Sequence, residues 1–372
     1  MIPEHVFSET LLQFLTPVLQ FLDDPSVSEV MINGPTQIFV ERRGRLELTG
    51  ARFESSEALE SALCNMAQYA GKRIDASMPI LEGRLPDGSR VEAVLPPAAP
   101  LGPFVAIRRF SLEALTVDKL VDGGSLTPDA ARALSVLVAS KFNILVAGGT
   151  GSGKTSLLNA LSSFIPGGER VVVIEDSREL QLQQGHVVGL QARPADARGR
   201  GAVTVRDLFR ATLRLRPDRI VVGEIRGGEA LDLIQAMTSG HGGCLSTLHA
   251  TYPHDTLSRL ETMAMMSDVQ MPLAALRVQL ASAVDLVVQT ARLSDGSRKV
   301  THITEVVDFS QTEGRYTLRD LFVRRFESDA FGALRDELVP SGRPPLAYQR
   351  VLDHGFELPA CMLGGEAPSE QS

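Results

Sequence analysis

The sequence has few cysteines and no excess of positive charge, and each shortage argues against a class of protein. Its three cysteines, Cys64, Cys244 and Cys361, lie far apart and include no C-x-x-C pair, so neither a zinc ribbon nor a disulfide framework is expected. Reduced thiols of a cytosolic protein are the ordinary interpretation. The net charge of −8 argues against a surface that binds nucleic acid or anionic lipid throughout, and it leaves a local basic patch open.

Long apolar runs are also missing. The longest runs stop at a charged residue, as at Lys141, well short of a membrane span. Residues 1–5 carry no basic region of the kind that opens a secretory signal. The chain is therefore expected to be cytoplasmic, with membrane contact only through partners.

The chain is long enough for two domains. It has 372 residues, of which 44% are hydrophobic and 22% charged, which is ordinary globular composition. Short helices and hairpins in residues 1–112 predict a small α+β domain. Residues 113–126, with a Gly-Gly pair at 123–124, are predicted to be an interdomain linker. Residues 127–363 are predicted to be a second domain, and residues 364–372 a disordered tail.

The second domain alternates between two hydrophobic patterns. Short apolar runs predict strands at 143–147, 170–174, 186–190, 219–222, 244–247 and 284–289. Helical spacing predicts helices at 128–139, 154–164, 204–215, 228–239 and 254–266. Such alternation is typical of an α/β fold with a mostly parallel sheet and helices on both faces. The C-terminal region is expected to be helical, with a short helix near 331–338.

A phosphate-binding motif follows the first of these strands. The pattern G-x-x-x-x-G-K-[ST] is formed by Gly148, Gly149, Thr150, Gly151, Ser152, Gly153, Lys154 and Thr155, and Ser156 continues into the predicted helix. Glycines let successive backbone N–H groups turn inward around a polyphosphate. Lys154 is predicted to reach the β- and γ-phosphates, and the Thr155 hydroxyl to bind Mg²⁺.

Carboxylates end two of the predicted strands. Glu224 follows Gly223, which stands where most P-loop NTPases have an aspartate. At the carboxyl end of a parallel strand, Glu224 would point into the ligand crevice, where it could orient or deprotonate a water or reach Mg²⁺ through water. Glu175 ends another strand and is predicted to assist in the same way. Asp176 and Glu179 fit solvated turn charges equally well.

Two histidines flank the predicted strand at 244–247. His241 and His249 are interpreted as groups that contact the γ-phosphate or sense its loss. A zinc site is the alternative, and it lacks further ligands.

Arginines form a third group of candidate functional residues. Arg84, Arg90, Arg108 and Arg109 lie in or beside strands of the first domain, where they could neutralise charge on a phosphoryl group. A second set lies within residues 193–219 and fits a solvated helix face, a subunit contact or polyanion binding; its members are Arg193, Arg198, Arg200, Arg206, Arg210, Arg214, Arg216 and Arg219.

Four motifs in this order resemble the secretion ATPase superfamily of bacterial type II and type IV secretion and type IV pili. They are the P-loop, an acidic box at 174–180, an atypical Walker B segment at 213–226 and a His box at 240–250. Leu85-Pro-Asp-Gly-Ser-Arg90-Val and Ile107-Arg-Arg-Phe in the first domain look like the CpaF-type ATPases of Tad (Flp) pili. The likeness covers about residues 25–360.

The resemblance implies a RecA-like P-loop ATPase domain behind the small N-terminal domain, ATP and Mg²⁺ as cofactors, and a homo-hexamer. It implies that Glu224 is the catalytic glutamate, Glu175 the acidic-box glutamate, and His241 and His249 the His-box residues. Arg90, Arg108 or Arg109 would contact phosphates. The partner would be an inner-membrane pilus or secretion platform, with no stable nucleic acid, and the protein would be peripheral at that membrane.

Two departures limit this transfer. The tetracysteine zinc motif of the type II secretion and pilus-extension branches is missing, and so is the long leading extension of many CpaF-type proteins. The leading hypothesis is a motor for Tad pilus assembly, and the close alternative is a type IV secretion ATPase that moves protein or DNA. A nucleotide-binding scaffold without useful turnover and a small-molecule kinase are the other classes considered.

Overall fold

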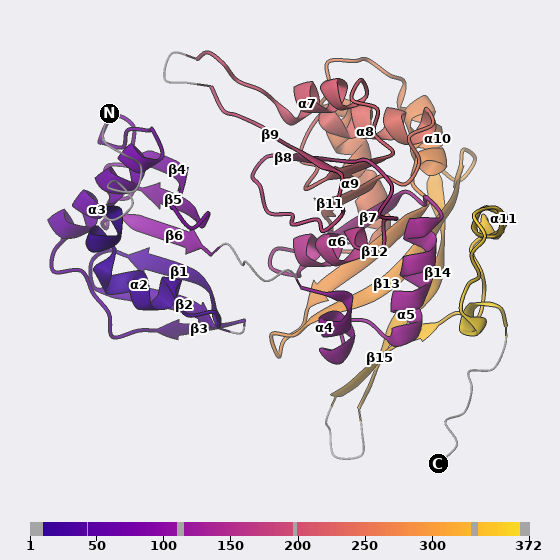
Figure 1. Cartoon of the computed structure of the whole chain (residues 1–372), viewed down its shortest axis with the longest axis horizontal. Coiled ribbons are helices and arrows are strands. Elements are labelled where there is room, and N and C mark those ends of the chain that lie inside the picture. The colour runs from indigo at the N-terminus through magenta and orange to yellow at the C-terminus, as the bar shows by residue number, and fades with distance from the viewer. Residues whose placement is uncertain (1–9, 43, 110–114, 196–198, 329–333, 365–372) are drawn as a thin grey trace. The chain divides into compact units, whose positions relative to one another are not determined.

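The chain folds into two compact units. The computed structural model describes residues 10–42, 44–109, 115–195, 199–328 and 334–364. The units are Met1–Glu113 and Ala114–Ser372, and each has its own sheet (Figure 1). The predicted tail therefore lies outside the described residues, apart from Gly364. No helix of the described residues is both long and apolar enough to cross a membrane.

The N-terminal unit is an antiparallel sheet with helices. Its elements are α2 (Thr16–Leu22), β1 (Val27–Asn33), β2 (Gln37–Arg42), β3 (Arg45–Leu48), α3 (Ser56–Tyr69), β4 (Ile80–Arg84), β5 (Arg90–Val94) and β6 (Phe104–Arg108). The described strands are ordered β3-β2-β1-β6-β5-β4. Val30 and Ile32 of β1 are fully buried against Leu59 and Leu63 of α3, and the Ser55 side chain caps α3 by accepting from the Ala58 N–H.

The second unit holds a longer series of elements. They are α4 (Val117–Asp122), α5 (Pro128–Ala139), β7 (Ile144–Gly148), α6 (Lys154–Ser162), β8 (Val171–Glu175), β9 (Val187–Gln191), α7 (Val205–Thr212), β10 (Arg219–Val222), α8 (Glu229–Thr238), β11 (Leu245–His249), α9 (Pro253–Met265), α10 (Leu273–Ala283), β12 (Leu286–Arg292), β13 (Arg298–Ser310), β14 (Arg315–Ser328), β15 (Leu334–Pro340), α11 (Tyr348–Asp353) and a 3₁₀ turn at Ala360–Met362.

The sheet of this unit confirms the predicted α/β class. Its described strands are ordered β15-β14-β13-β12-β7-β11-β10-β8-β9, and β12 through β9 in that order are parallel. Every residue of β7, β8 and β10 is buried, as expected for parallel strands covered on both faces. Ile144 and Val146 of β7 pack with α5 and α6, whereas Leu145 and Ala147 pack with α8, α9 and α10.

The C-terminal region differs from the prediction. The helix predicted near 331–338 is wrong, because Leu334–Pro340 forms β15, which pairs antiparallel with β14; residues 329–333 lie outside the described residues. The charged run at 335–337 favours a helix locally, but pairing with β14 buries Leu338 and sets Asp336 against Arg324. Tertiary contacts here outweigh local propensity.

Part of the segment expected to be a linker is helical. The Thr116 side chain accepts from the Lys119 N–H and caps α4. Leu120 and Leu126 are buried in the core of the second unit. Residues 115–126 are therefore packed on that unit, and residues 110–114 lie outside the described residues.

Candidate active site

The phosphate-binding motif forms a tight loop between β7 and α6. Gly151 and Gly153 have φ of +69° and +91°, a region in which side chains are strained. A Cβ at Gly148 would lie 2.3 Å from Thr290 Oγ1 and 2.4 Å from Ser152 Oγ. Those two hydroxyls are 2.8 Å apart, so the base of the loop closes on β12 and only glycine fits at its start.

Lys154 opens α6 and turns back over the loop. Its side chain is largely buried, and Nζ donates to the Gly149 carbonyl oxygen at 3.0 Å. Nζ also lies 3.3 Å from His249 Nδ1 on β11. The backbone N–H groups of the first helical turn face the same end of α6, which gives a polyphosphate both dipole and hydrogen-bond partners there.

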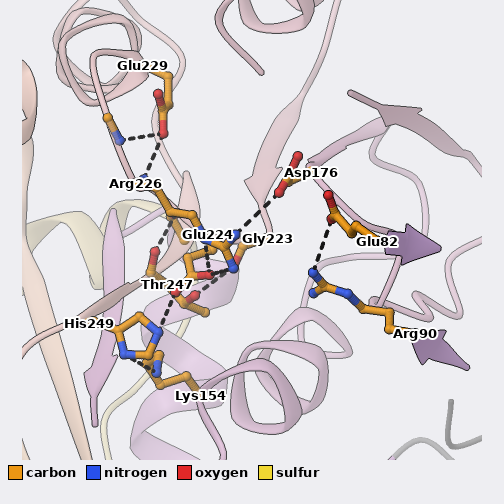
Figure 2. Close-up of polar contacts among 12 residues, drawn as sticks. Glu82, Arg90, Lys154, Asp176, Gly223, Glu224, Arg226, Glu229, Thr247 and His249 are labelled. Atoms are coloured by element: carbon orange, nitrogen blue, oxygen red, sulfur yellow. Dashed lines mark hydrogen bonds and ion pairs between the residues drawn. The ribbon is translucent and has the colours of Figure 1, made fainter. Parts of the chain in front are cut away.

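Glu224 is held beside this lysine by contacts between β10 and β11. Thr247 Oγ1 donates to the Gly223 carbonyl oxygen at 2.7 Å, and the Ile225 N–H donates to the Thr247 carbonyl oxygen at 2.9 Å. These two bonds fix the backbone on either side of Glu224. The turn after β10 therefore has one orientation, and Glu224 faces His249 (Figure 2).

A chain of polar contacts runs from Lys154 to Asp176 in Figure 2. His249 Nε2 lies 2.8 Å from Glu224 Oε1. Arg226 Nε donates to Glu224 Oε2 at 2.6 Å, and its Nη1 lies 3.3 Å from Asp176 Oδ2. The guanidinium thus holds one oxygen of the Glu224 carboxylate by a hydrogen bond, while the other oxygen lies beside the imidazole and accepts no hydrogen bond from the described residues.

The contacts define the protonation state of His249. A lysine ammonium can only donate, so Nδ1 of His249 must accept from Lys154 and the proton resides on Nε2, facing Glu224. Burial and then the nearby Lys154 charge lower the pKa of His249, and Arg259 and Arg226 act in the same direction, while Glu224 opposes them. His249 is therefore neutral at neutral pH.

This state predicts a pH dependence. As the pH falls through the lowered pKa, an imidazolium would repel Lys154 and lose the Nδ1 acceptor, so ATP turnover should fall on an acidic limb whose midpoint lies below the ordinary histidine value of about 6.5. As the pH falls, the unfolded chain binds this proton before the folded protein does. The free energy of unfolding therefore also decreases as the pH falls through that range. Turnover measured from about pH 5 to pH 8 should lose this limb in His249→Gln.

The exposed His254 supplies the control for this profile. His254→Gln should retain the acidic limb. An unchanged limb in His249→Gln would contradict the assignment of the limb to His249.

Glu175 is buried at the end of β8 and supports the next turn. Its Oε1 accepts the N–H groups of Glu179 at 2.7 Å and Leu180 at 2.8 Å. Burial raises its pKa, and these two hydrogen bonds oppose that rise. A Cβ on Gly223 would lie 3.1 Å from Glu175 Cγ, which explains why glycine stands where an aspartate is usual in P-loop NTPases.

The structure does not bring His241 into this group. His249 is level with Gly148 in the parallel pairing of β11 and β7. His241 precedes β11, on the amino side of the sheet, and Leu245 alone is about 13 Å from His249 along the strand. His241 Nδ1 is buried and makes no hydrogen bond among the described residues. The predicted role of His241, contact with the γ-phosphate, therefore stays a prediction, and no described contact within the second unit supports it.

Several arginines of the 193–219 segment make structural contacts. Arg206 and Arg210 of α7 pair with Asp232 of α8. The fully buried Arg219 pairs with Glu169 on the amino side of the sheet, and a Cβ on Gly243 would lie 2.1 Å from its Nη1. These contacts favour a structural role for the three arginines; Arg198 lies outside the described residues.

The predicted arginines of the N-terminal unit form a row. Arg84, Arg90 and Arg108 are directly opposite one another on β4, β5 and β6, so their side chains share one face. Arg90 lies 3.8 Å from Glu82. Arg109 differs, because its Nη1 donates to the carbonyl oxygens of Asp24 and Val27 within its own unit.

Sequence reasoning missed the residues that hold the site together. Thr247 and Thr290 have this role, because their hydroxyls donate to backbone carbonyl oxygens of Gly223 and Ala147 beside Glu224 and the phosphate-binding loop. The available signal was positional, because each follows or ends an apolar run at the carboxyl edge of the sheet.

Comparisons with known proteins agree on one family for this chain. Residues 13–322 match the family described as type II/IV secretion system protein. The type IV secretion system protein PtlH of Bordetella pertussis is 37% identical over 334 residues, covering 82% of this chain and 94% of PtlH. The conjugal transfer protein TrbB of Rhizobium radiobacter is 35% identical over 288 residues, covering 76% of this chain and 85% of TrbB.

A solved structure shares the fold. The ATPase DotB of Legionella pneumophila superposes with a TM-score of 0.55 at 22% identity, over 81% of this chain and 82% of DotB. This supports the RecA-like fold of the second unit, preceded by a small N-terminal domain.

Proposed function

The chain belongs to the family of type II/IV secretion system proteins, and on that premise we propose that it is a magnesium-dependent ATPase that powers a secretion machine. The observation that carries the proposal is the contact chain Lys154–His249–Glu224 beside the phosphate-binding loop. It combines a phosphate-binding cation, a neutral imidazole and a carboxylate whose side chain is 17% exposed. Those are the groups that hydrolysis of a phosphoanhydride requires.

Each residue has a part in this reaction. Lys154 exchanges its contacts with Gly149 and His249 for the β- and γ-phosphates. Glu224 orients the attacking water and accepts its proton, while Arg226 holds the carboxylate in place beside His249. After hydrolysis, His249 Nε2–H can donate either to Glu224 or to the departing phosphate, which makes it suited to sensing the γ-phosphate.

The donor set fits a magnesium ion. Mg²⁺ prefers oxygen ligands and keeps several waters, and the Thr155 hydroxyl on the first turn of α6 is an oxygen donor at the loop. The carboxylates of Glu224 and Glu175 would act through water, Glu175 with the oxygen that does not accept the Glu179 and Leu180 N–H groups. Bound there, the ion would neutralise charge on the phosphate chain.

Phosphate contacts from the N-terminal unit are assigned to Arg90 and Arg108. The two guanidinium groups stand on adjacent strands in direct register, a spacing suited to the oxygens of a phosphate. Arg109 already donates to two carbonyl groups, so it is a weaker candidate for a phosphate contact than Arg90 and Arg108.

The double variant Arg90→Gln, Arg108→Gln should lose turnover by at least about 100-fold, because arginine fingers act chiefly on the transition state. ATP affinity should fall by less. Steady-state turnover and nucleotide titration measure the two effects, with Arg45→Gln, an exposed arginine on β3, as the control for loss of an arginine away from this row. Wild-type turnover in the double variant would remove both residues from the mechanism.

The machine is inferred from the relatives. PtlH is named as a type IV secretion system protein and TrbB as a conjugal transfer protein, which favours type IV secretion over the Tad/Flp pilus motor that the motifs first suggested. As a motor of either kind, the protein would act as a homo-hexamer in the cytoplasm, at an inner-membrane platform. Domain closure on ATP and opening on release would transmit force.

One experiment separates the motor from a nucleotide-binding scaffold. Light scattering and steady-state turnover are measured together over a protein concentration series, with Mg-ATP and with ATP plus EDTA. The motor predicts a hexamer whose magnesium-dependent turnover per subunit rises with assembly. A stable monomer or dimer that binds ATP without turnover would favour the scaffold.

A further inference from the structure

The hairpin that joins β12 to β13 reaches the phosphate-binding loop from the side opposite Glu224. Arg298, the first residue of β13, donates from Nε to the Gly151 carbonyl oxygen at 2.9 Å. A Cβ on Gly153 would lie 3.4 Å from Arg298 Cδ. The sheet order places β11 and β10 on one side of β7 and β12 on the other, so Arg298 approaches the loop away from the Lys154–His249–Glu224 chain.

The contact with Gly151 sets the direction of a peptide group. In a trans peptide the carbonyl and the following N–H point in opposite directions. Since Arg298 holds the Gly151 carbonyl outward, the Ser152 N–H points into the loop, where Gly149 O lies 3.4 Å away. Because this hydrogen bond is long, a phosphate oxygen can readily replace Gly149 O as the acceptor for the Ser152 N–H. Arg298 therefore holds one N–H of the cradle in its binding direction.

The same strand end is attached to the segment through which the chain enters the second unit. This entry segment comprises residues 115–125, which contain α4 and the turn after it. The Ser125 hydroxyl donates to the Arg298 carbonyl oxygen. Lys299 Nζ donates to the Gly124 carbonyl oxygen at 3.0 Å, and the Val300 N–H donates to the Ser125 carbonyl oxygen at 3.1 Å.

A buried arginine makes this attachment stiff. Arg324 on β14 donates from Nη2 to the carbonyl oxygens of Ser125 at 2.8 Å and Gly124 at 3.2 Å. Its Nε donates to the Val300 carbonyl oxygen at 2.7 Å, and its side chain is 2% exposed. A shift at the start of β13 must therefore move the entry segment or break several hydrogen bonds.

We propose that Arg298 is a positioning residue that presets the phosphate-binding loop and couples its occupancy to the entry segment. The inference rests on the proposed ATPase function and adds a route by which the loop acts on the chain that leads to the N-terminal unit. A ligand that holds the Gly151–Ser152 peptide in one orientation also restrains the Arg298 side chain, which donates to Gly151. Through the hydrogen bonds of β13, Arg298 in turn restrains Ser125 and Gly124. By linkage, the entry segment influences nucleotide affinity to the same extent.

The test compares wild type, Arg298→Ala, Arg298→Lys and the control Arg315→Ala. Arg315 is an exposed arginine that begins β14, across from the far end of β13, and it pairs with Glu313. Mg-ADP is titrated by calorimetry, and amide hydrogen exchange of residues 115–125 is followed with and without saturating Mg-ADP. We expect the alanine variant to bind about tenfold more weakly and to lose the nucleotide-dependent protection of 115–125 at saturation. The lysine variant should recover part of both, and Arg315→Ala should match wild type.

A second variant probes the other end of the connection without touching the loop. The pair Ser125→Ala, Lys299→Met should lose the protection of 115–125 and bind Mg-ADP up to about threefold more weakly than wild type, a loss that by linkage equals the coupling itself. Wild-type affinity and wild-type protection in Arg298→Ala, or full protection in the Ser125–Lys299 double variant, would overturn the coupling. No binding of Mg-ADP or Mg-ATP by the wild type would instead overturn the proposed function, and the coupling with it.

Discussion

Replacing Glu224 with glutamine is expected to lower ATP turnover about a thousandfold, with ATP affinity within about threefold of wild type. Glutamine keeps the shape of the side chain and one oxygen that can accept from Arg226, but its amide nitrogen is a donor and it cannot accept a proton from water. The Arg226 hydrogen bond, at 2.6 Å, can be kept by the glutamine oxygen and should limit the change in geometry. The loss should therefore appear in kcat.

Asp176 supplies the matched control. It contacts the same Arg226 guanidinium at 3.3 Å and is half exposed, so Asp176→Asn removes a carboxylate near the site without removing the proposed base. Turnover of Asp176→Asn should stay within about threefold of wild type. Equal losses in both variants would show that Glu224 acts through the electrostatics of the cluster, whereas full turnover in Glu224→Gln would remove it from the mechanism.

Lys154→Ala should lose ATP turnover to background and weaken nucleotide binding by at least about 100-fold. Two charge-assisted contacts with the phosphate chain disappear, each with a contribution of roughly 1.5 to 3 kcal/mol. Two of the acceptors that Nζ contacts are neutral, Gly149 O and His249 Nδ1, so removing the lysine leaves neither of them as an unpaired charge. The fold should therefore persist, as judged by thermal unfolding.

The same variant has a second readout at His249. The Lys154 charge is one of the causes that lower the pKa of His249, so its removal should raise that pKa toward the ordinary histidine value. NMR titration of the imidazole would measure the change. Lys154→Arg should not rescue turnover, because a planar guanidinium cannot fill the place of a compact ammonium. An unchanged His249 pKa in Lys154→Ala would contradict the contact.

The sequence predicts the parallel part of the fold well. Fully buried strands such as β7 and β8 are continuous apolar runs, and helices between them have an apolar face of regular spacing, so local pattern and final structure agree. The antiparallel strands at the C-terminus were harder to predict. Residues 334–340 carry charges that favour a helix locally, and only the pairing with β14, together with the Arg324–Asp336 contact, makes them a strand.

The candidate site also has residues that the sequence predicts and residues that it does not. Lys154, Glu224 and His249 follow strands whose carboxyl ends share one edge of the sheet, so topology alone brings them together. His241 carries the same type of side chain but precedes its strand, and the structure leaves it on the amino side. Thr247, Thr290 and Arg298 act on backbone atoms, and such roles have no signature in residue spacing. They can be found only when the loop and its neighbours are seen in three dimensions.

The position of β7 in the sheet has a consequence for how the site comes into being during synthesis. The strand that carries the phosphate-binding loop pairs with β11 and β12, whose residues lie about 100 and 140 positions later in the chain. Until residue 292 has left the ribosome, β7 lacks one of its two neighbours and Thr290 is not there to close the base of the loop. Pairings between such distant segments form late and slowly. A nascent chain that already carries the whole motif therefore lacks the strand that closes the loop, and an apolar strand without all its neighbours is exposed to aggregation until β12 is made.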